Sequence, residues 1–265
     1  MMRVFVEGVG IAGPGLPGWT PSRSILAGGE AYRPGPTMVA ASELLPAAER
    51  RRAPLAVKLA LAAGEEAFRN AGRDAASTAT VFASSSSDGD TLHHICETLA
   101  SADRDVSPTR FHNSVHNAAA GYWSIATRCR KPSTSLGCYD ASFAAGLLEA
   151  AVQATAGGVP VCLISYDQPY PEPLHSARPI AASFGAALVL APESGKAAFA
   201  ALEIEFLPSP GRATAMTDAG LEAARRGNAA ARALPLLAAL AEKGSRNVIL
   251  DYLPGAHLRI AASSC

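Results

Sequence analysis

Short apolar runs alternate with helical stretches along most of the chain. In PLAVKLALAAGEEAFRNA (54–71), Val57, Leu61 and Phe68 share one helical face, and Gly72 can end the helix. Apolar runs bounded by glycine, proline or serine predict strands instead. The predicted helices cover 54–71, 91–100, 113–128, 141–156 and 217–243. The predicted strands cover 3–12, the TATVFA run, 133–138, 159–166, 184–191, 199–206, 247–253 and 257–262.

This alternation predicts an α/β protein with a layered sheet. No linker divides the chain and no segment repeats, so we expect one domain over residues 1–265. The hydrophobic fraction of 49% is sufficient for a large core, and the charged fraction is 17%.

Charge and cysteine content narrow the function classes. Lys+Arg and Asp+Glu both number 23, so no basic excess indicates nucleic acid or an anionic membrane as a partner. No apolar stretch is long enough for a membrane span, and the N-terminus lacks the features of a signal peptide. Five scattered cysteines without a C-x-x-C pair fit a reducing compartment, so a cytoplasmic location is expected.

Two glycine- or serine-rich runs resemble cofactor motifs only superficially. Residues 8–13 match G-x-G-x-x-G, but Pro14 and Pro17 prevent the helix that would receive a pyrophosphate. The serines at 84–87 are followed by no P-loop lysine, which favours a tolerant loop. No cofactor is expected.

The segment STSLGCYDASFAAGLLEA (133–150) reads as a strand, a tight corner and a helix. A cysteine at the N-terminus of a helix has a lowered pKa and can act as an acyl-accepting nucleophile. Asp140 is the better N-cap, so we expect the helix to begin after it. Cys138 then lies at the end of the strand.

The histidines give no clear metal or catalytic site. His112 and His116 have the i, i+4 spacing of metal ligands, but a third ligand is missing. We therefore predict no metal site, and a polar interface or pocket role for this pair. His257, in the alternating HLRI run, is expected on the surface of a strand.

The stretch SPTRFHNSVHNAAAGYWSIATRCRKPSTSLGCYDASFAAGLLEA (107–150) resembles the N-terminal half of the β-ketoacyl synthase branch of the thiolase-like superfamily. The segments RVFVEGVGIAGPG, RRAPLAVKLALAAGEEAFRNAG, ATVFASSSS and SFGAALVLAPES also match, in the same order. The resemblance covers about residues 1–205. It implies a thiolase-like layered α-β-α half-fold with a mixed sheet, followed by a divergent segment from about residue 207.

The resemblance also implies a lost nucleophile. Aligned without gaps, the family's catalytic cysteine falls on Asp140, and Ser142 matches a small residue after it. A carboxylate cannot form the acyl thioester of the condensation, so no catalytic residue is expected. A two-residue gap would restore Cys138 as nucleophile, with His116 as base. None of the six histidines lies in the family's C-terminal histidine motifs.

Short chain-length factors of bacterial type II systems, including aryl-polyene systems, are the members that this chain resembles most. Such proteins do not condense, and they pair with an active ketosynthase that an acyl carrier protein visits. The resemblance implies a role in polyketide or fatty acid (polyene) biosynthesis. It implies that strand 133–138 lies beside the edge strand of the partner, so that the sheet continues across the interface. The implied interface and tunnel residues are His116, Asn117, Ser135, Leu136, Ser142 and Phe143.

An exposed edge strand must be paired or covered. The chain expressed alone is therefore expected to be poorly soluble or to form a homodimer. Two other functions stay open at this point. One is a stand-alone acyltransferase or thioester hydrolase that uses Cys138 and His116. The other is a non-catalytic scaffold or binding protein.

Overall fold

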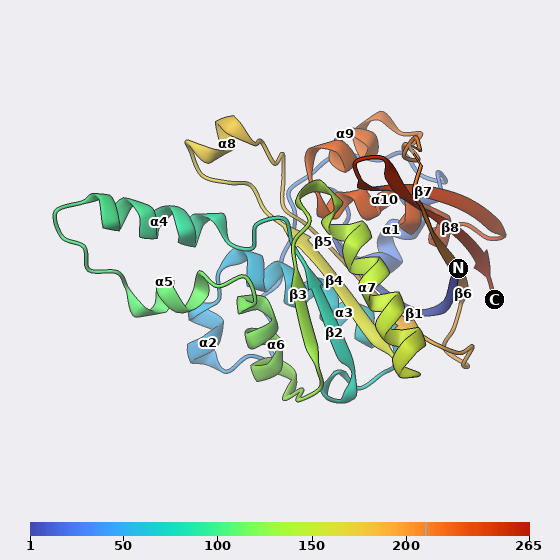
Figure 1. Cartoon of the computed structure of the whole chain (residues 1–265), viewed down its shortest axis with the longest axis horizontal. Helices are drawn as coiled ribbons and strands as arrows, with labels where there is room; N and C mark the ends of the chain where they lie inside the picture. The colour runs from blue at the N-terminus through green and yellow to red at the C-terminus, as the bar shows by residue number, and fades with distance from the viewer. Residues whose placement is uncertain (210) are drawn as a thin grey trace.

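The structure, a computed structural model, describes residues 1–209 and 211–265. Its centre is an eight-stranded mixed sheet with the order β3-β2-β4-β5-β1-β6-β8-β7 (Figure 1). Strand β2 pairs in parallel with both β3 and β4, and the remaining pairs are antiparallel. The strands are β1 (Met2–Ala12), β2 (Ala79–Ala83), β3 (Ser133–Leu136), β4 (Val161–Asp167), β5 (Phe184–Ala191), β6 (Ala200–Leu207), β7 (Ser245–Leu253) and β8 (Ala256–Ser264).

Helices cover both faces of the sheet, which confirms the expected α-β-α layering. They are α1 (Trp19–Leu26), α2 (Ala47–Arg52), α3 (Leu55–Ala71), α4 (Gly89–Ala100), α5 (Pro108–Asn113), α6 (Ala118–Thr127), α7 (Ser142–Gly157), α8 (Leu174–Ala177), α9 (Ala219–Gly227) and α10 (Leu234–Ala241). Short 3-10 turns span Ala75–Ser77, Tyr139–Ala141 and Ala230–Ala233.

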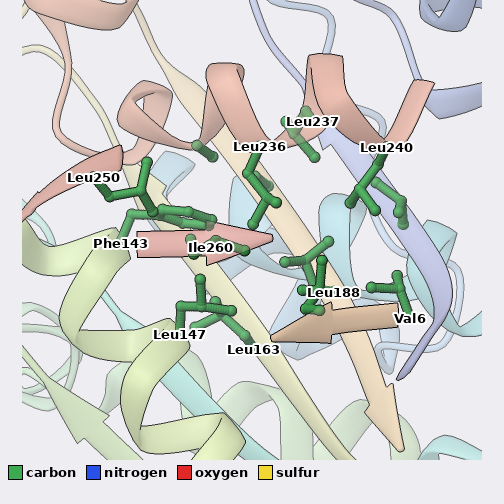
Figure 2. Close-up of a cluster of buried hydrophobic side chains, with 14 of the residues drawn as sticks. Val6, Phe143, Leu147, Leu163, Leu188, Leu236, Leu237, Leu240, Leu250 and Ile260 are labelled. Atoms are coloured by element: carbon green, nitrogen blue, oxygen red, sulfur yellow. The ribbon is translucent and has the colours of Figure 1, made fainter. Parts of the chain in front are cut away.

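Alternate residues of the central strands divide the core in two. Leu188 of β5 joins the cluster on the side of α7 and α10 (Figure 2), whereas Val189 joins the cluster on the side of α3 and α6. Successive strand side chains point to opposite faces, so a strand covered on both faces is apolar throughout. This explains the unbroken apolar sequence of β5, in which all eight residues are buried.

The glycines at the start of the chain have a packing role. A Cβ atom on Gly10 would stand 1.9 Å from the carbonyl oxygen of Ala63, and one on Gly8 would stand 2.1 Å from that of Ala67. Both glycines let β1 pack directly against α3. The first two glycines of the G-x-G-x-x-G pattern therefore have a packing role between β1 and α3.

The structure corrects two helix predictions. The helix expected over 217–243 is divided into α9, a 3-10 turn and α10, because Asn228 is extended and its Oδ1 accepts the N–H of Ala231. The helix expected over 113–128 begins only at Ala118, after the separate helix α5. Helix α1 was not predicted, because it directly follows a run of glycine and proline residues.

The two ends of the sheet differ. Strand β3 is the outermost strand at one end, which confirms the prediction of an edge strand at 133–138. At the other end, Thr214 covers Ile249 in the middle of β7: its N–H donates to the Ile249 carbonyl, and its Oγ1 accepts the Ile249 N–H, both at 2.9 Å. Within the described residues, no helix combines the length and apolar character needed to cross a membrane.

Candidate functional site

The candidate site is the corner between β3 and α7. Tyr139, in the 3-10 turn of the corner, has φ 52°, a left-handed conformation that non-glycine residues rarely adopt. Ser142 holds the turn, since its Oγ accepts the Cys138 N–H at 3.0 Å and donates to the Tyr139 carbonyl at 2.7 Å. Strained backbone of this kind is found where structure around it fixes the geometry, often at functional sites.

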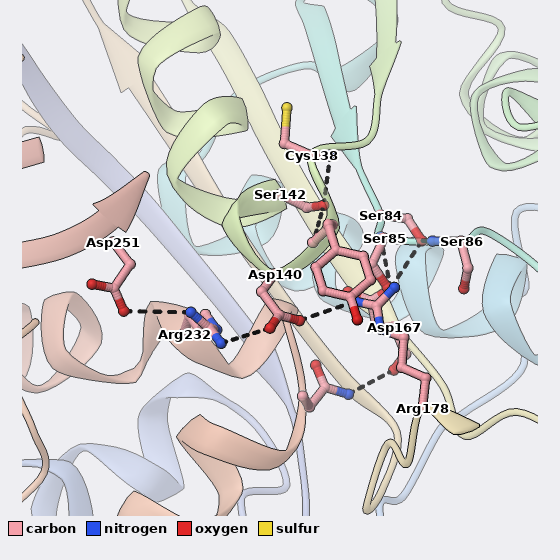
Figure 3. Close-up of polar contacts among 12 residues, drawn as sticks. Ser84, Ser85, Ser86, Cys138, Asp140, Ser142, Asp167, Arg178, Arg232 and Asp251 are labelled. Atoms are coloured by element: carbon pink, nitrogen blue, oxygen red, sulfur yellow. Dashed lines mark hydrogen bonds and ion pairs between the residues drawn. The ribbon is translucent and has the colours of Figure 1, made fainter. Parts of the chain in front are cut away.

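Asp140 does not cap α7, contrary to the prediction. The helix begins at Ser142, after Ala141, and no side chain caps it. The Asp140 carboxylate instead accepts hydrogen bonds from two arginines, Arg178 at 3.0 Å and Arg232 at 2.9 Å (Figure 3). The preceding 3-10 turn removes Asp140 from the N-cap position, and its side chain is free to form these ion pairs.

The two arginines come from segments far from the corner in sequence. Arg178 follows α8 in the connection between β4 and β5, and Arg232 lies in the 3-10 turn before α10. The Arg178 guanidinium also lies 3.4 Å from the centre of the Tyr139 ring, a cation–π contact. Arg232 also pairs with Asp251 at 3.4 Å. The sequence analysis identified neither arginine.

Cys138 is half-buried, and its thiol points away from Asp140 and Ser142 (Figure 3). His116 reaches the same corner: a Cβ atom on Gly137 would stand 3.2 Å from its Nε2. That Nε2 lies 3.2 Å from the Ser84 carbonyl oxygen, which can only accept a hydrogen bond. In this contact Nε2 acts as the donor, so it does not face the Cys138 thiol as an acceptor. No hydrogen bond joins the Cys138 thiol to a histidine in the described part of the chain.

A buried carboxylate lies beside the corner, where β2 and β4 end. Asp167 is fully buried, and its Oδ1 accepts the Ser84 hydroxyl, the Ser85 hydroxyl and the Ser85 N–H at 3.2, 2.7 and 2.8 Å. Burial raises the pKa of Asp167 to about 6, although these hydrogen bonds and the charge of Arg178 act in the opposite direction. The serine-rich run is thus ordered by its hydrogen bonds to Asp167, and it is not the tolerant loop that was predicted.

The remaining predicted residues occupy three environments. Asn117 is exposed before α6, and Ser135 is half-buried on the edge strand β3. Leu136, also half-buried, packs against the main core. Phe143 is 1% exposed and lies in that core beside Leu147 and Leu250 (Figure 2). Phe143 is therefore buried within this chain, and its role in the wall of a tunnel stays a prediction.

The histidines differ from their predicted places. His112 belongs to α5, whereas His116 lies in the turn before α6, so they do not share a helical face. The ring of His112 packs edgewise against Tyr122, with the centroids 6.1 Å apart. His257 is buried, not exposed as predicted, and its Nδ1 lies 2.8 Å from the Ser209 carbonyl. Over residues 1–209 and 211–265, no three potential ligands gather into a metal site.

Solved structures with this fold align along the whole chain. One is the ketosynthase ApeO in complex with its chain length factor ApeC from Xenorhabdus doucetiae, with 20% identity, a TM-score of 0.74, and coverage of 99% of this chain and 100% of that chain. The ishigamide ketosynthase/chain length factor has 14% identity, a TM-score of 0.71, and coverage of 100% and 99%. At these identities the matches establish the fold.

A third structure, AntDE:AntF, is a type II polyketide synthase acyl-carrier protein in complex with its ketosynthase. It has 12% identity, a TM-score of 0.72, and coverage of 100% of this chain and 99% of that chain. No curated protein matches the sequence. The family model described as the β-ketoacyl synthase N-terminal domain matches residues 28–251. The chain therefore belongs to the β-ketoacyl synthase N-terminal domain family.

Proposed function

We propose that this chain is a non-condensing, chain-length-factor-like subunit. It pairs with a β-ketoacyl-acyl carrier protein synthase of a type II system for polyketide or fatty acid synthesis, of the polyene kind. The observation that carries the proposal is the ion-paired state of Asp140. Sequence resemblance puts this residue where the family has its nucleophile, and two guanidinium groups bind its carboxylate.

The chemistry of this position opposes condensation. A ketosynthase must hold the acyl group as a thioester, from which the chain later departs to a carbanion. A carboxylate would form a mixed anhydride instead, which water hydrolyses readily. Arg178 and Arg232 also donate hydrogen bonds to the Asp140 oxygens. They stabilise the negative charge of the carboxylate, which makes it a weaker nucleophile. These arginines favour a structural role for Asp140.

The other nucleophile at the corner, Cys138, has no hydrogen bond from its thiol to a base among the described residues. Nε2 of His116 donates to the Ser84 carbonyl, and the Cys138 thiol points away from the rest of the corner. An acyl-transfer site needs a nucleophile, a base within hydrogen-bond reach, and donors for the oxyanion. The geometry therefore favours a partner role over a stand-alone Cys138 enzyme.

The edge strand β3 supports a partner at this end of the sheet. The Pro132 and Leu136 carbonyls face β2, since they accept N–H groups of Thr80 and Ser84. Backbone groups alternate along a strand, so those of Ser133 and Ser135 point outward, where a second edge strand can pair with them. We propose that the second edge strand, which pairs with β3, belongs to the cognate ketosynthase. An acyl carrier protein then delivers the substrate to the heterodimer.

Reconstitution tests the proposal. The chain and its cognate ketosynthase are purified separately and together, then supplied with acyl and malonyl carrier proteins. We expect condensation from the complex, retained with Cys138→Ala and abolished when the catalytic cysteine of the partner is replaced. The chain alone should show no acyl adduct by intact mass. An acyl adduct on Cys138, with turnover by the isolated chain, would overturn the proposal in favour of an enzyme.

A further inference from the structure

Two connections leave the sheet side by side. Strands β2 and β4 are parallel neighbours, with Ala83 opposite Ser165, so the segments that follow them begin at the same edge of the sheet. After β2 the chain continues through the serine-rich run into an arm formed by α4 and α5, residues 89–113. After β4 it continues through α8 in the β4–β5 connection, residues 168–183. Both segments project from this end of the molecule (Figure 1).

The β4–β5 connection holds the first turn of α4. Asp88 is the N-cap of α4, and its Oδ1 accepts the side-chain amide of Gln168 at 3.0 Å. Gly89, the first residue of the helix, lies against Tyr170: a Cβ atom on Gly89 would stand 2.7 Å from a carbon atom of the Tyr170 ring. Gln168 and Tyr170 are both buried. The base of the arm therefore packs directly on this connection.

The same connection holds the corner before α7. Arg178 donates to Asp140 at 3.0 Å (Figure 3), and its guanidinium lies 3.4 Å from the centre of the Tyr139 ring. On its other contact, the Nη1 of Arg178 lies 3.5 Å from the Tyr170 hydroxyl. Tyr170 thus meets Arg178 through its hydroxyl and Gly89 through its ring carbons. A continuous series of contacts joins the corner to the arm.

The ends of the connection are fixed, whereas its middle is exposed. The Nδ2 of Asn228 donates to the carbonyls of Asp167 and Ala182, at 3.2 and 2.8 Å. Helix α8 lies between these two ends, and none of its four residues is buried. A segment that is fixed at its ends and exposed between them can change position as a unit while the sheet stays unchanged.

We propose that the β4–β5 connection couples the corner before α7 to the arm, through the contacts of Arg178 and Tyr170. When Arg178 leaves Asp140, Tyr170 loses its contact at the corner, and the first turn of α4 loses the surface on which it packs. A molecule that binds the corner in place of Arg178 thereby increases the mobility of the arm. The coupling lies within this chain, so it goes beyond the proposed function and does not depend on a partner.

Hydrogen exchange of the purified chain, read by mass spectrometry, tests the effect of the corner on the arm. Arg178→Met should raise the exchange rate of residues 88–96 about 5-fold or more. Arg232→Met is the matched control, because it removes the other ion pair of Asp140 but lies outside the connection. It should change the exchange rate of residues 88–96 less than about 2-fold. Exchange in β5 should be unchanged in both variants.

Gly89→Ala tests the effect of the arm on the corner, since coupling between two sites is reciprocal. The added methyl group would displace the Tyr170 ring, whereas alanine itself favours the helix, so a weaker α4 cannot explain the result. The N–H groups of Cys138 and Ala141 are bonded within the corner, and their exchange should rise about 5-fold or more. Gly121→Ala, in α6, is the control, because a Cβ atom there meets nothing within 4 Å. It should leave the corner unchanged.

Three results would overturn the inference. Equal exchange of residues 88–96 in Arg178→Met and Arg232→Met would show that the connection carries no effect from the corner to the arm. An unchanged corner in Gly89→Ala would show that no return effect exists, although coupling requires one. Faster exchange throughout the chain, β5 included, would show a general loss of stability in place of coupling.

Discussion

Asp140 and Arg178, 38 residues apart in the chain, form an ion pair of 3.0 Å that fastens the β4–β5 connection to the corner before α7. The same guanidinium lies over the ring of Tyr139, so one side chain contacts two successive residues of the corner. The corner is thus held by an arginine from another part of the chain, the long and irregular connection between β4 and β5. This arrangement makes the stability of the corner depend on charge.

Asp140→Asn should lower the free energy of unfolding by about 1 kcal/mol. The amide keeps the shape of the side chain but leaves both arginines without a carboxylate. The effect stays small because the Asp140 side chain is 45% exposed, and water screens the pairs. Urea unfolding of Asp140→Asn, Arg178→Met and the double variant measures the coupling. Additive effects of the two substitutions would contradict a direct interaction.

The buried Asp167 should make stability depend on pH. Its pKa is raised from 3.8 to about 6, so the folded state binds a proton that the unfolded state has released in this window. The free energy of unfolding should therefore fall as the pH rises from about 4 to 6, by on the order of 3 kcal/mol, and then level off. Asp167→Asn should lose this decline.

Urea unfolding between pH 4 and 7 checks this prediction. Glu65 and Glu66 also have raised pKa values, mainly through burial, and they contribute in the same direction. The difference between the unchanged chain and Asp167→Asn isolates Asp167. Parallel pH profiles for the two proteins would show that Asp167 titrates in the folded state as an ordinary aspartate does.

Phe143→Ala should destabilise the chain by about 3–5 kcal/mol, because it opens a cavity in the main core. Phe206→Ala is the control: Phe206 is 44% exposed, and its loss should cost less than about 1 kcal/mol. Denaturant unfolding of both variants measures the difference. Equal effects would show that Phe143 is less tightly packed than its 1% exposure indicates.

Ser135→Pro should weaken the heterodimer without unfolding the chain. The Ser135 N–H points away from β2, so proline removes a hydrogen bond to the partner and none within this sheet. Affinity for the ketosynthase should fall about 10-fold or more. Light scattering and titration of the two purified subunits provide the measurement. Unchanged affinity, with the fold intact, would show that the partner does not pair with β3.

Elements of the fold were predictable where local sequence and tertiary packing agree. The apolar run of β5 and the amphipathic helix α3 ended by Gly72 both formed as expected. The helix over 217–243 was mispredicted because its break depends on distant contacts of Asn228, whose Nδ2 donates to the carbonyls of Asp167 and Ala182. No local pattern records such contacts.

The site was predictable only in part, for the same reason. The corner itself follows from a strand, a turn and a helix that are adjacent in sequence. Arg232 reaches Asp140 from 92 residues away, so its role depends on the tertiary fold. The assignment of Asp140 as an N-cap followed its residue type, which is a sound local argument. It failed because the 3-10 turn moved the helix start to Ser142.

The Thr214 bonds at Ile249 make the two ends of the sheet unequal for the addition of a further strand. Backbone pairing is available at β3, whereas at the other end Ile249 is already bonded through both its N–H and its carbonyl. A sheet open at both ends could add subunits repeatedly and grow into a fibre. A sheet open at one end stops after a single addition. Growth of the sheet through β7 would first have to break both Thr214 bonds at Ile249, whereas pairing at the outward backbone groups of β3 breaks no bond to Thr214.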